Sequence, residues 1–503
     1  TWAKNQISII SSALCGETPK FQAAGSPGEF FIIFGCSLNN PLMAEEANTG
    51  SVNISGLNPE EFALSWGEID GKPALYIEGV DPAGAVYGVF HFFKSLGCSF
   101  DISGDRYPAT NEDMPVTRIR TRGTTANTWR GIYFQYCFAT NSLMSLRDYE
   151  LMFDQMAKMR LNRICYYYFP NEPFLDFSFR GERKLVGDIS YPDSGYMSYG
   201  RHFSGSYLVS DIEIGGELFN RDRVAPMEFQ DVRSSDEALD TGKKFLSQLI
   251  DLAAARGIKT WISFLPTFVP PNFAKYLRRM PRPHLHWSDL VSATDPVLDE
   301  INRCRLEAIL ANFPKLDGVF CGIPEGYYED PYPESQKLVE ERRAEFTNSL
   351  KIHRDLWGGY WNNDESVLED HIRRDICFTE IADRTLKIAR ELSKEIKLGV
   401  MTVCKSYLAG YLDEKLPKDV VFADIESRSL WTKSGAPLHL FKDIKNRECV
   451  IIPRAYDDGS MAGLQFNIGL YDKDRYVHSA LENGTDGLLI QLTHLRGNEH
   501  NTR

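Results

Sequence analysis

From Thr128 onward, short apolar runs rich in Val, Ile and Phe alternate with longer stretches of helical periodicity. Such runs are typical of strands buried on both faces, because helices cover one face and a core covers the other. The eight runs are Gly131–Tyr136, Arg163–Tyr168, Ile258–Leu265, Leu316–Cys321, Leu398–Cys404, Val420–Ile425, Cys449–Pro453 and Gly487–Leu492. A parallel connection requires a helix-length crossover, and eight such units close into a ring. We therefore predict an α/β protein with a (β/α)8 TIM barrel over residues 128–503.

The stretches between these runs carry the boundary signals of amphipathic helices. One begins at Ser145 with an S-x-x-D start, and its apolar residues recur at three to four positions. Others are predicted over 236–256, 296–313 and 378–396, and the second of these opens with a proline. Because the chain stops just past the eighth strand, we expect the barrel to continue beyond the given C-terminus or to take its last helix from elsewhere.

Residues 1–120 have a different pattern, with short β-rich runs and one helix-like segment from Ala83 to Leu96. The apolar residues of that segment could cover a small sheet. We predict a separate small α/β domain whose carboxylates are solvated. A polar stretch from Ser103 to Thr125 is predicted to be the linker to the barrel.

The net charge of −13 at pH 7 argues against a protein that binds nucleic acid, since such proteins carry basic surfaces. No run approaches the ~18 uncharged apolar residues of a membrane span. The chain begins at Thr1 without Met or a leader, and we expect a secreted, periplasmic or cell-surface protein whose signal peptide has been removed. A shortened cytoplasmic chain is the alternative.

Neither a metal nor a cofactor is expected. The sequence has no P-loop, no GxGxxG between strand and helix, no GxSxG elbow and no HExxH. His284 and His286 form an HxH pair without a third ligand nearby. The ten cysteines show no CxxC spacing, which indicates buried small hydrophobic residues before disulfides.

Long insertions follow the second and fourth predicted strands, at the end of the barrel where enzymes of this fold keep their sites. They are rich in aromatic residues, whose rings suit the apolar faces and hydroxyl rims of sugars. A carbohydrate cleft is the interpretation we favour over ordinary loop packing. Its predicted aromatic contacts are Tyr168, Trp287 and Tyr327.

Carboxylates follow two predicted strands on opposing sides of the barrel. Glu325 leaves the fourth strand in a turn framed by proline and glycine. Asp424 and Glu426 end the sixth strand and, being two residues apart, are predicted to point together into the barrel mouth. Glycosidic cleavage needs one protonated carboxyl and one ionised carboxylate. We therefore predict Glu325 as the acid and Glu426 or Asp424 as its partner. Salt bridges to rim arginines are the structural alternative.

Basic residues also follow the later strands. They are Lys405, Arg428, Arg454 and Arg496, with His494 nearby. Guanidinium groups bind carboxylates through two parallel hydrogen bonds, so in this acidic chain the cluster favours an anionic sugar such as a uronic acid. The same side chains could instead hold the rim carboxylates in place.

Several segments resemble a known group of enzymes. Residues 75–90 (LYIEGVDPAGAVYGVF) with Leu96-Gly97-Cys98 look like the N-terminal α/β domain that precedes the barrel in microbial α-glucuronidases and β-N-acetylhexosaminidases. Residues 129–132 (WRGI), 149–159 and 161–162 are similar to the start of the hexosaminidase barrel. The resemblance implies a glycoside hydrolase, and it implies that Arg130 contacts sugar hydroxyls.

One departure from the hexosaminidase pattern shifts the expected chemistry. That family has an Asp-Glu pair after the fourth strand, in which Asp orients the acetamido group, whereas this chain has Pro324-Glu325. The resemblance therefore implies a divergent, α-glucuronidase-like hydrolase of an oligosaccharide or polysaccharide. The alternatives are a β-N-acetylhexosaminidase lacking the usual Asp, and a non-catalytic glycan-binding protein on a decayed barrel.

Overall fold

The structure is a computed structural model, and the residues that it describes are 2–16, 20–21, 30–38, 40–49, 52–109, 120–125, 127–135, 144–168, 170, 172–185, 226–229, 231–232, 234–278, 291–323, 330–346, 365–403, 408–426, 441, 444, 446–453, 482 and 484–491. The chain divides into two compact units. The first comprises residues 1–128, 149–162 and 252–258, and the second comprises 129–148, 163–251 and 259–503.

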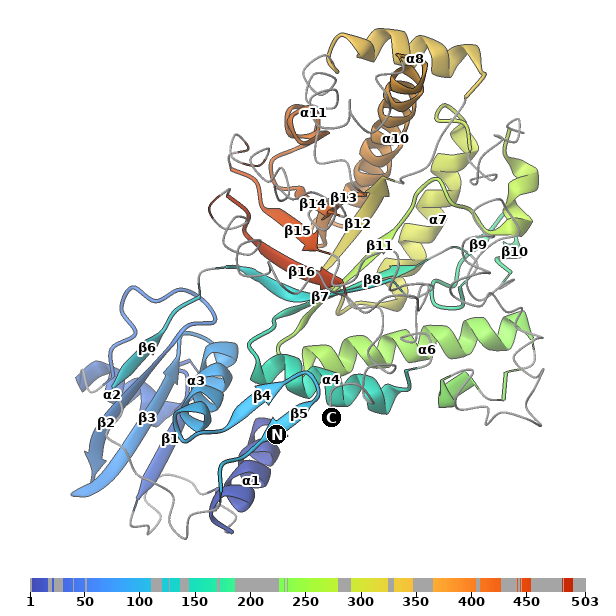
Figure 1. Cartoon of the computed structure of the whole chain (residues 1–503). Helices are drawn as coiled ribbons and strands as arrows, with labels where there is room; N and C mark the ends of the chain where they lie inside the picture. Colours follow the sequence, from blue (N-terminus) through green and yellow to red (C-terminus); the bar gives the residue numbers. More distant parts are fainter. Residues whose placement is uncertain are drawn as a thin grey trace. The chain divides into compact units, whose positions relative to one another are not determined.

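Eight parallel strands of the second unit close into a barrel in the order β11-β12-β13-β14-β15-β16-β7-β8 (Figure 1). They are β7 (Trp129–Gln135), β8 (Arg163–Tyr168), β11 (Lys259–Phe264), β12 (Gly318–Ile323), β13 (Lys397–Val403), β14 (Val421–Glu426), β15 (Cys449–Pro453) and β16 (Gly487–Gln491). Each predicted run forms one of these strands, within two residues at either end. The predicted fold class, an α/β barrel after a small N-terminal sheet, is confirmed.

Helices connect these strands. They are α4 (Leu146–Lys158), α6 (Ser235–Ala254), α7 (Pro296–Asn312), α8 (Pro333–Arg343), α10 (Glu365–Leu392) and α11 (Ala409–Lys415), with 3-10 turns η5 (Met227–Phe229) and η6 (Pro271–Tyr276). Helix α10 begins thirteen residues before the predicted 378, and α8 lies in the insertion after β12 that was expected to be a loop. Helix α10 packs on β12 and β13 and against α7 and α8 (Figure 1).

The predicted helix starts are capped as their sequences imply. The Asp148 carboxylate accepts hydrogen bonds from the Ser145 backbone N–H at 2.8 Å and from its hydroxyl at 2.9 Å, which forms a capping box at α4. At α7, Asp295 accepts from the Val297 N–H at 3.0 Å, and Pro296 occupies the first turn.

Large rings fill the barrel near the N-terminal ends of its strands. Trp129, Trp261 and Phe320 stand on β7, β11 and β12, and their ring centroids lie 4.6–6.1 Å apart. Because β8 separates β7 from β11, these contacts cross the interior and show which face of each strand points inward. Glycine is needed beside the rings, since a Cβ at Gly318 would lie 2.6 Å from Trp261 and one at Gly399 would lie 2.3 Å from Phe320.

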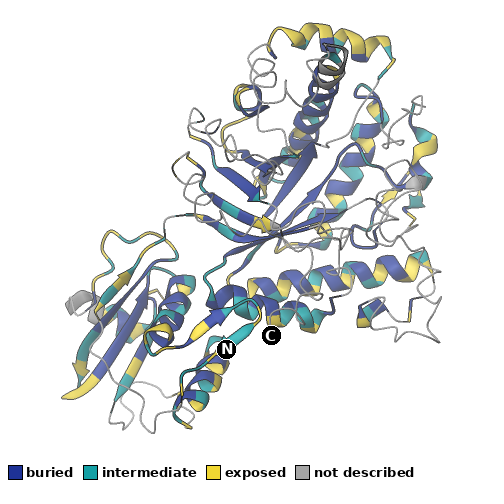
Figure 2. Cartoon of the chain, in the orientation of Figure 1, coloured by how far each residue is buried: buried dark blue, intermediate teal, exposed yellow. Residues whose placement is uncertain are grey.

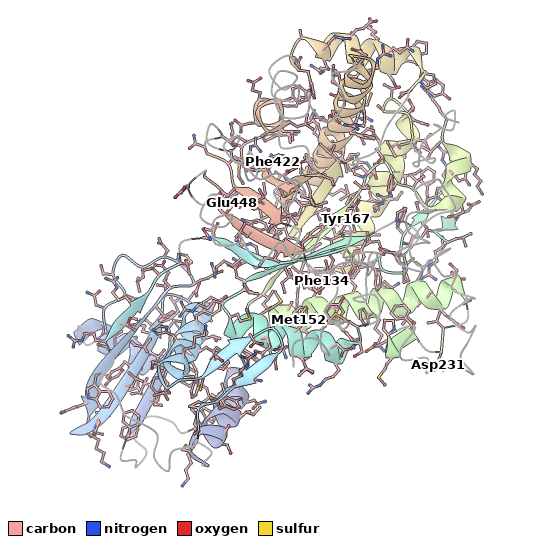
Figure 3. The ribbon with its side chains drawn as sticks, viewed as in Figure 1. Phe134, Met152, Tyr167, Asp231, Phe422 and Glu448 are labelled. Atoms are coloured by element: carbon pink, nitrogen blue, oxygen red, sulfur yellow. The ribbon has the colours of Figure 1, made fainter. Side chains whose placement is uncertain are left out.

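Both faces of the barrel strands are buried, and Figure 2 shows the strands dark along most of their length. Inward residues such as Tyr133 and Tyr167 alternate with outward residues such as Phe134 and Tyr166, whose rings stack 6.1 Å apart. Figure 3 labels Phe134 on β7 and Tyr167 on β8. Continuous apolar runs therefore follow from burial on two sides.

The first unit contains a four-stranded sheet in the order β1 (Phe31–Gly35), β3 (Lys72–Gly79), β2 (Phe62–Ile69) and β6 (Thr121–Gly123), with β1 parallel to β3 and the other pairs antiparallel. Helices α1 (Trp2–Cys15) and α3 (Pro82–Ser95) cover one face, and α2 (Pro41–Thr49) contributes to the core on the other. Strands β4 (Ser99–Asp101) and β5 (Gly104–Arg106) form a separate hairpin.

Two expectations about this unit are corrected. The stretch from Ser103 to Thr125 is not only a linker, because it supplies β5 and β6. Its carboxylates are also not all solvated. Glu78 is fully buried and accepts a hydrogen bond from the Ser37 hydroxyl, and burial raises its pKa. Glu61 is buried and accepts from the backbone N–H groups of Asn58 and Thr125.

Candidate active site

The carboxyl ends of the strands, where barrel enzymes keep their sites, carry most of the residues that the sequence singled out. Glu325 comes two residues after Ile323, the last residue of β12. Glu325 itself lies outside the described residues, as do Trp287, Tyr327, Lys405, Arg428, Arg454, His494 and Arg496. Their convergence on one cleft stays a prediction.

The two carboxylates of β14 differ from their expected placement. Ala423 and Ile425 face the barrel interior, so Asp424 between them faces outward. Asp424 is fully buried and accepts a hydrogen bond from the Thr402 hydroxyl of the neighbouring strand β13. The prediction that Asp424 points into the barrel mouth is wrong. Glu426 ends the strand, and its side chain lies outside the described residues.

Arg130 is also misplaced for the role that the resemblance implied. It is the second residue of β7, next to the inward-facing Trp129, and its side chain is half-buried on the outer face. Five residues of extended chain separate it from Gln135, which is roughly 17 Å at ~3.3 Å per residue. Arg130 therefore stands at the N-terminal end of the barrel, and its predicted contact with a sugar at the opposite end is corrected.

The run of tyrosines at the end of β8 divides between the two faces of the strand. Tyr168 faces outward, is 2% exposed, and stacks on Phe174 with ring centroids 4.9 Å apart. Its predicted role in sugar binding is therefore wrong. Tyr167 faces the barrel interior near the carboxyl end of β8. Its ring centroid lies 6.2 Å from that of Tyr133 on β7. Strand alternation could have identified both inward tyrosines from the sequence.

Two buried cations hold the segments that follow β8 and β11. Lys184 donates hydrogen bonds from Nζ to the carbonyl oxygens of Pro170 and Glu172, at 3.0 and 2.6 Å. Arg305 of α7 donates to the carbonyl oxygens of Leu265, at 3.1 Å, and Phe268. Burial lowers the pKa of Lys184 to about 7 and that of Arg305 to about 9. Neither residue directly follows a barrel strand, so neither was predicted as a site residue.

An ion-pair network lies on the outer part of the same region. Asp176 accepts hydrogen bonds from Arg183, at 2.8 and 2.9 Å, and from Lys243, at 2.9 Å. Burial alone would raise the pKa of Asp176, but these two cations outweigh it and bring the pKa down to about 2. Asp176 is therefore a charged anchor for the segment after β8.

Three further observations bear on cofactors and environment. No group of three His, Cys, Asp or Glu side chains that could hold a metal ion occurs among the described residues. Across the described part of the chain, no helix combines the length and the apolar character that crossing a membrane requires. None of the eight described cysteines forms a disulfide with another of them, and six are buried, as expected for small hydrophobic residues.

No protein-family model and no curated protein matches this sequence. Solved structures do match it. A GH89 enzyme from Clostridium perfringens, in complex with its substrate GlcNAc-alpha-1,4-galactose, has a TM-score of 0.53 at 11% identity, covering 98% of this chain and 46% of that one. A GH20 beta-N-acetylhexosaminidase from Streptomyces coelicolor has a TM-score of 0.51 at 9% identity, covering 97% and 78%.

A GH138 enzyme targeting pectin rhamnogalacturonan II matches with a TM-score of 0.48 at 13% identity, covering 93% of this chain and 46% of that one. This chain thus spans less than half the length of the GH89 and GH138 proteins. These structural neighbours are glycoside hydrolases, and the chain shares a fold with the GH89 and GH20 enzymes. The predicted resemblance to glycoside hydrolases is therefore confirmed for the fold.

Proposed function

We propose that this protein is a glycosidase that cleaves a glycosidic bond in a complex glycan. The observation that carries the proposal is that β12 ends at Ile323, two residues before Glu325 in the sequence, in a barrel of the kind found in glycoside hydrolases. A carboxyl group at a barrel strand end is placed to donate a proton to a leaving glycosidic oxygen.

Glu426 is the proposed partner of Glu325. Asp424, the other candidate, is fully buried on the outer face of β14. Glu426 has the same parity in the strand, and its candidacy rests on its position as the last residue of β14. One strand, β13, separates β12 from β14 in the ring, so the prediction that the two glutamates follow strands on opposing sides of the barrel is wrong. The ionised partner acts as the nucleophile or as the base for water.

The proposed substrate is an oligosaccharide or polysaccharide with an acidic, uronic sugar. Support comes from the four cations that follow β13 to β16 in sequence: Lys405, Arg428, Arg454 and Arg496. Successive strands of the closed barrel bring their carboxyl ends to one rim, which favours convergence of these side chains. Arginine pairs with carboxylates through two parallel hydrogen bonds, whereas a neutral sugar offers no such partner.

An N-acetylhexosaminide is the second candidate substrate. The GH20 neighbour is a beta-N-acetylhexosaminidase, and the substrate in the GH89 complex is GlcNAc-alpha-1,4-galactose. Against it stands Pro324, which occupies the position before the acid where hexosaminidases are expected to have Asp.

A panel of aryl glycosides tests the proposal. The panel contains matched uronides, N-acetylhexosaminides and neutral hexosides in both anomeric forms. We expect turnover of a uronide, and we expect Arg428→Ala to weaken it far more than turnover of the neutral counterpart. Preferred turnover of N-acetylhexosaminides would favour the second candidate. Binding without turnover on every sugar would contradict the glycosidase and favour a glycan-binding protein.

A further inference from the structure

The apolar interior of the barrel reaches the carboxyl ends of its strands. Leu265, which directly follows β11, and Ile425 near the end of β14 are buried members of the interior cluster. Val403, the last residue of β13, lies in register with Ile425 and packs against the same cluster, as does Phe268. Val403 and Phe268 are only partly buried. Apolar surface therefore becomes accessible at this end of the barrel, at Phe268 and Val403.

The main chain around Phe268 is held from the outer side of the barrel. The Phe268 N–H donates a hydrogen bond to the Leu265 carbonyl oxygen at 3.1 Å, which closes a tight turn after β11. Arg305 of α7 donates to the carbonyl oxygens of Leu265, at 3.1 Å, and Phe268. Its guanidinium lies 4.9 Å from the ring centroid of Phe264, which alternates with the inward Leu265 and so faces outward. The carbonyl oxygens of this turn are thus bound on the α7 side, whereas the side chains of Leu265 and Phe268 pack against the interior cluster.

A second residue of α7 fixes the same turn. Asn302, one helical turn before Arg305, donates from Nδ2 to the Pro266 carbonyl oxygen at 3.1 Å. Both donors are buried, so the loss of either one would leave a carbonyl oxygen unsatisfied away from water. Three of the four carbonyl oxygens in residues 265–268 are bound by α7 in this way. A surface with such a fixed conformation loses little entropy when a ligand binds to it.

The chemistry of the Phe268 side chain indicates what it can bind. The side chain has a flat face and no hydrogen-bonding group, so it contributes apolar contact rather than recognition of hydroxyls. One face of a pyranose ring presents mainly C–H groups, whose partially positive hydrogens suit the negative face of an aromatic ring. Enzymes of this fold bind their substrates at the end of the barrel where Phe268 lies. A sugar ring is thus the ligand that suits both the location and the surface.

We propose that Phe268 is a substrate-binding residue whose ring packs against the C–H face of the sugar. The inference rests on the proposed function, because that function supplies a sugar at the carboxyl end of the barrel. Arg305 and Asn302 then hold the turn that carries the ring. The contact does not change as the bond breaks, so it contributes to substrate binding rather than to the rate of the chemical step.

The test compares Phe268→Ala with Tyr276→Ala, on the aryl glycoside that the wild type turns over best. Tyr276 also lies between β11 and α7 and is partly buried, but its ring centroid lies 5.4 Å from that of Phe179 and 5.3 Å from the Arg180 guanidinium. We expect Phe268→Ala to raise KM by roughly 10- to 100-fold and to change kcat by less than about threefold. Tyr276→Ala should leave both constants unchanged. An unchanged KM in a folded Phe268→Ala would overturn the proposal and show that the ring only packs the barrel.

Two milder variants separate the flat ring from general packing, and they cover the case in which Phe268→Ala does not fold. Phe268→Tyr keeps the ring, and its KM should stay within about threefold of the wild type. Phe268→Leu keeps the apolar packing and removes the flat face, and its KM should rise roughly tenfold. Far-UV circular dichroism checks that both variants fold. Equal changes in KM for the two variants would contradict a contact made by the flat ring.

Isothermal titration calorimetry with free glucuronate, N-acetylglucosamine and glucose tests the contact without turnover. We expect the wild type to bind at least one of these sugars, and Phe268→Ala to bind that sugar at least about tenfold more weakly. Equal affinity of the two proteins would overturn the role of Phe268 while leaving the glycosidase in place. A wild type that turns over none of the glycosides and binds none of the three sugars would instead contradict the proposed function, and the role of Phe268 with it.

Discussion

The two ends of the barrel are closed by different chemistry. At the N-terminal end, the rings of Trp129, Trp261 and Phe320 fill the interior. At the carboxyl end, the buried side chains of Lys184 and Arg305 hold loop carbonyl oxygens rather than strands. The side chains at the N-terminal end thus join strands to each other, whereas those at the carboxyl end fix the segments that follow the strands.

Carboxylates show the same contrast. Asp317, just before β12, accepts a hydrogen bond from the Thr260 backbone N–H at 2.8 Å. Asp486, just before β16, accepts one from the Cys449 backbone N–H at 2.7 Å. Burial raises the pKa of both. Asp176, in the segment after β8, is paired with two cations and has its pKa lowered to about 2. The N-terminal end therefore contributes to stability alone, whereas charge at the carboxyl end places the loops that a site would use.

The largest stability effect is expected from Trp261→Ala at the N-terminal end. Truncation of a fully buried ring leaves a cavity, and we expect a loss of about 3–5 kcal/mol in the free energy of unfolding. Ile490→Ala on β16 is the control, since Ile490 is 40% exposed and should cost about 1 kcal/mol or less. Urea unfolding followed by circular dichroism measures both. Similar losses for the two variants would contradict the assignment of the interior face.

Arg305→Met should cause the next largest loss in the free energy of unfolding, and it should also disturb the carboxyl end of the barrel. It leaves the carbonyl oxygens of Leu265 and Phe268 without their buried donor, at a cost of about 2–3 kcal/mol. Turnover should fall as well, because the segment after β11 loses its anchor. Arg303→Met is the matched control: its ion pair with Glu391 is exposed and contributes below about 1 kcal/mol. If the two variants behave alike, Arg305 does not hold the rim.

Asp176→Asn should have the smallest effect, with a pH dependence that identifies it. Since the pKa of Asp176 is lowered in the folded state, its stabilisation is complete above pH ~4 and is lost as the pH falls toward 2. We expect a loss of about 1–2 kcal/mol at pH 7 that shrinks steadily on acidification. Asp240→Asn, which removes an exposed partner of Arg183, should match the wild type. A pH-independent loss in Asp176→Asn would show that charge is not its contribution.

The barrel strands could be predicted from sequence because burial on two faces gives each one a continuous apolar run. Because both faces of each strand are buried, burial alone does not show which face points into the barrel. In β14, one face carries Val421, Ala423 and Ile425 and the other carries Phe422 with the two carboxylates, so the pattern separates the faces without showing which of them points inward. That choice is decided by rings on other strands, such as Trp261, and only the structure shows it.

The residues that hold the segments after the barrel strands could not be predicted from sequence, for a different reason. Lys184 and Arg305 bind backbone carbonyl oxygens of segments distant in sequence. No local spacing marks such contacts. The strand ends themselves were predicted from sequence, whereas the residues that hold the segments after them follow from tertiary packing alone.

The central claim is tested most directly by Glu325→Gln, which keeps the shape of the side chain and removes its proton. On substrates with a poor leaving group, we predict a fall in turnover of roughly 10²–10⁴-fold. Activated aryl substrates should lose much less, because their leaving groups depart without protonation. Equal slowing of both classes, or no slowing of either, would contradict the assignment of Glu325 as the general acid.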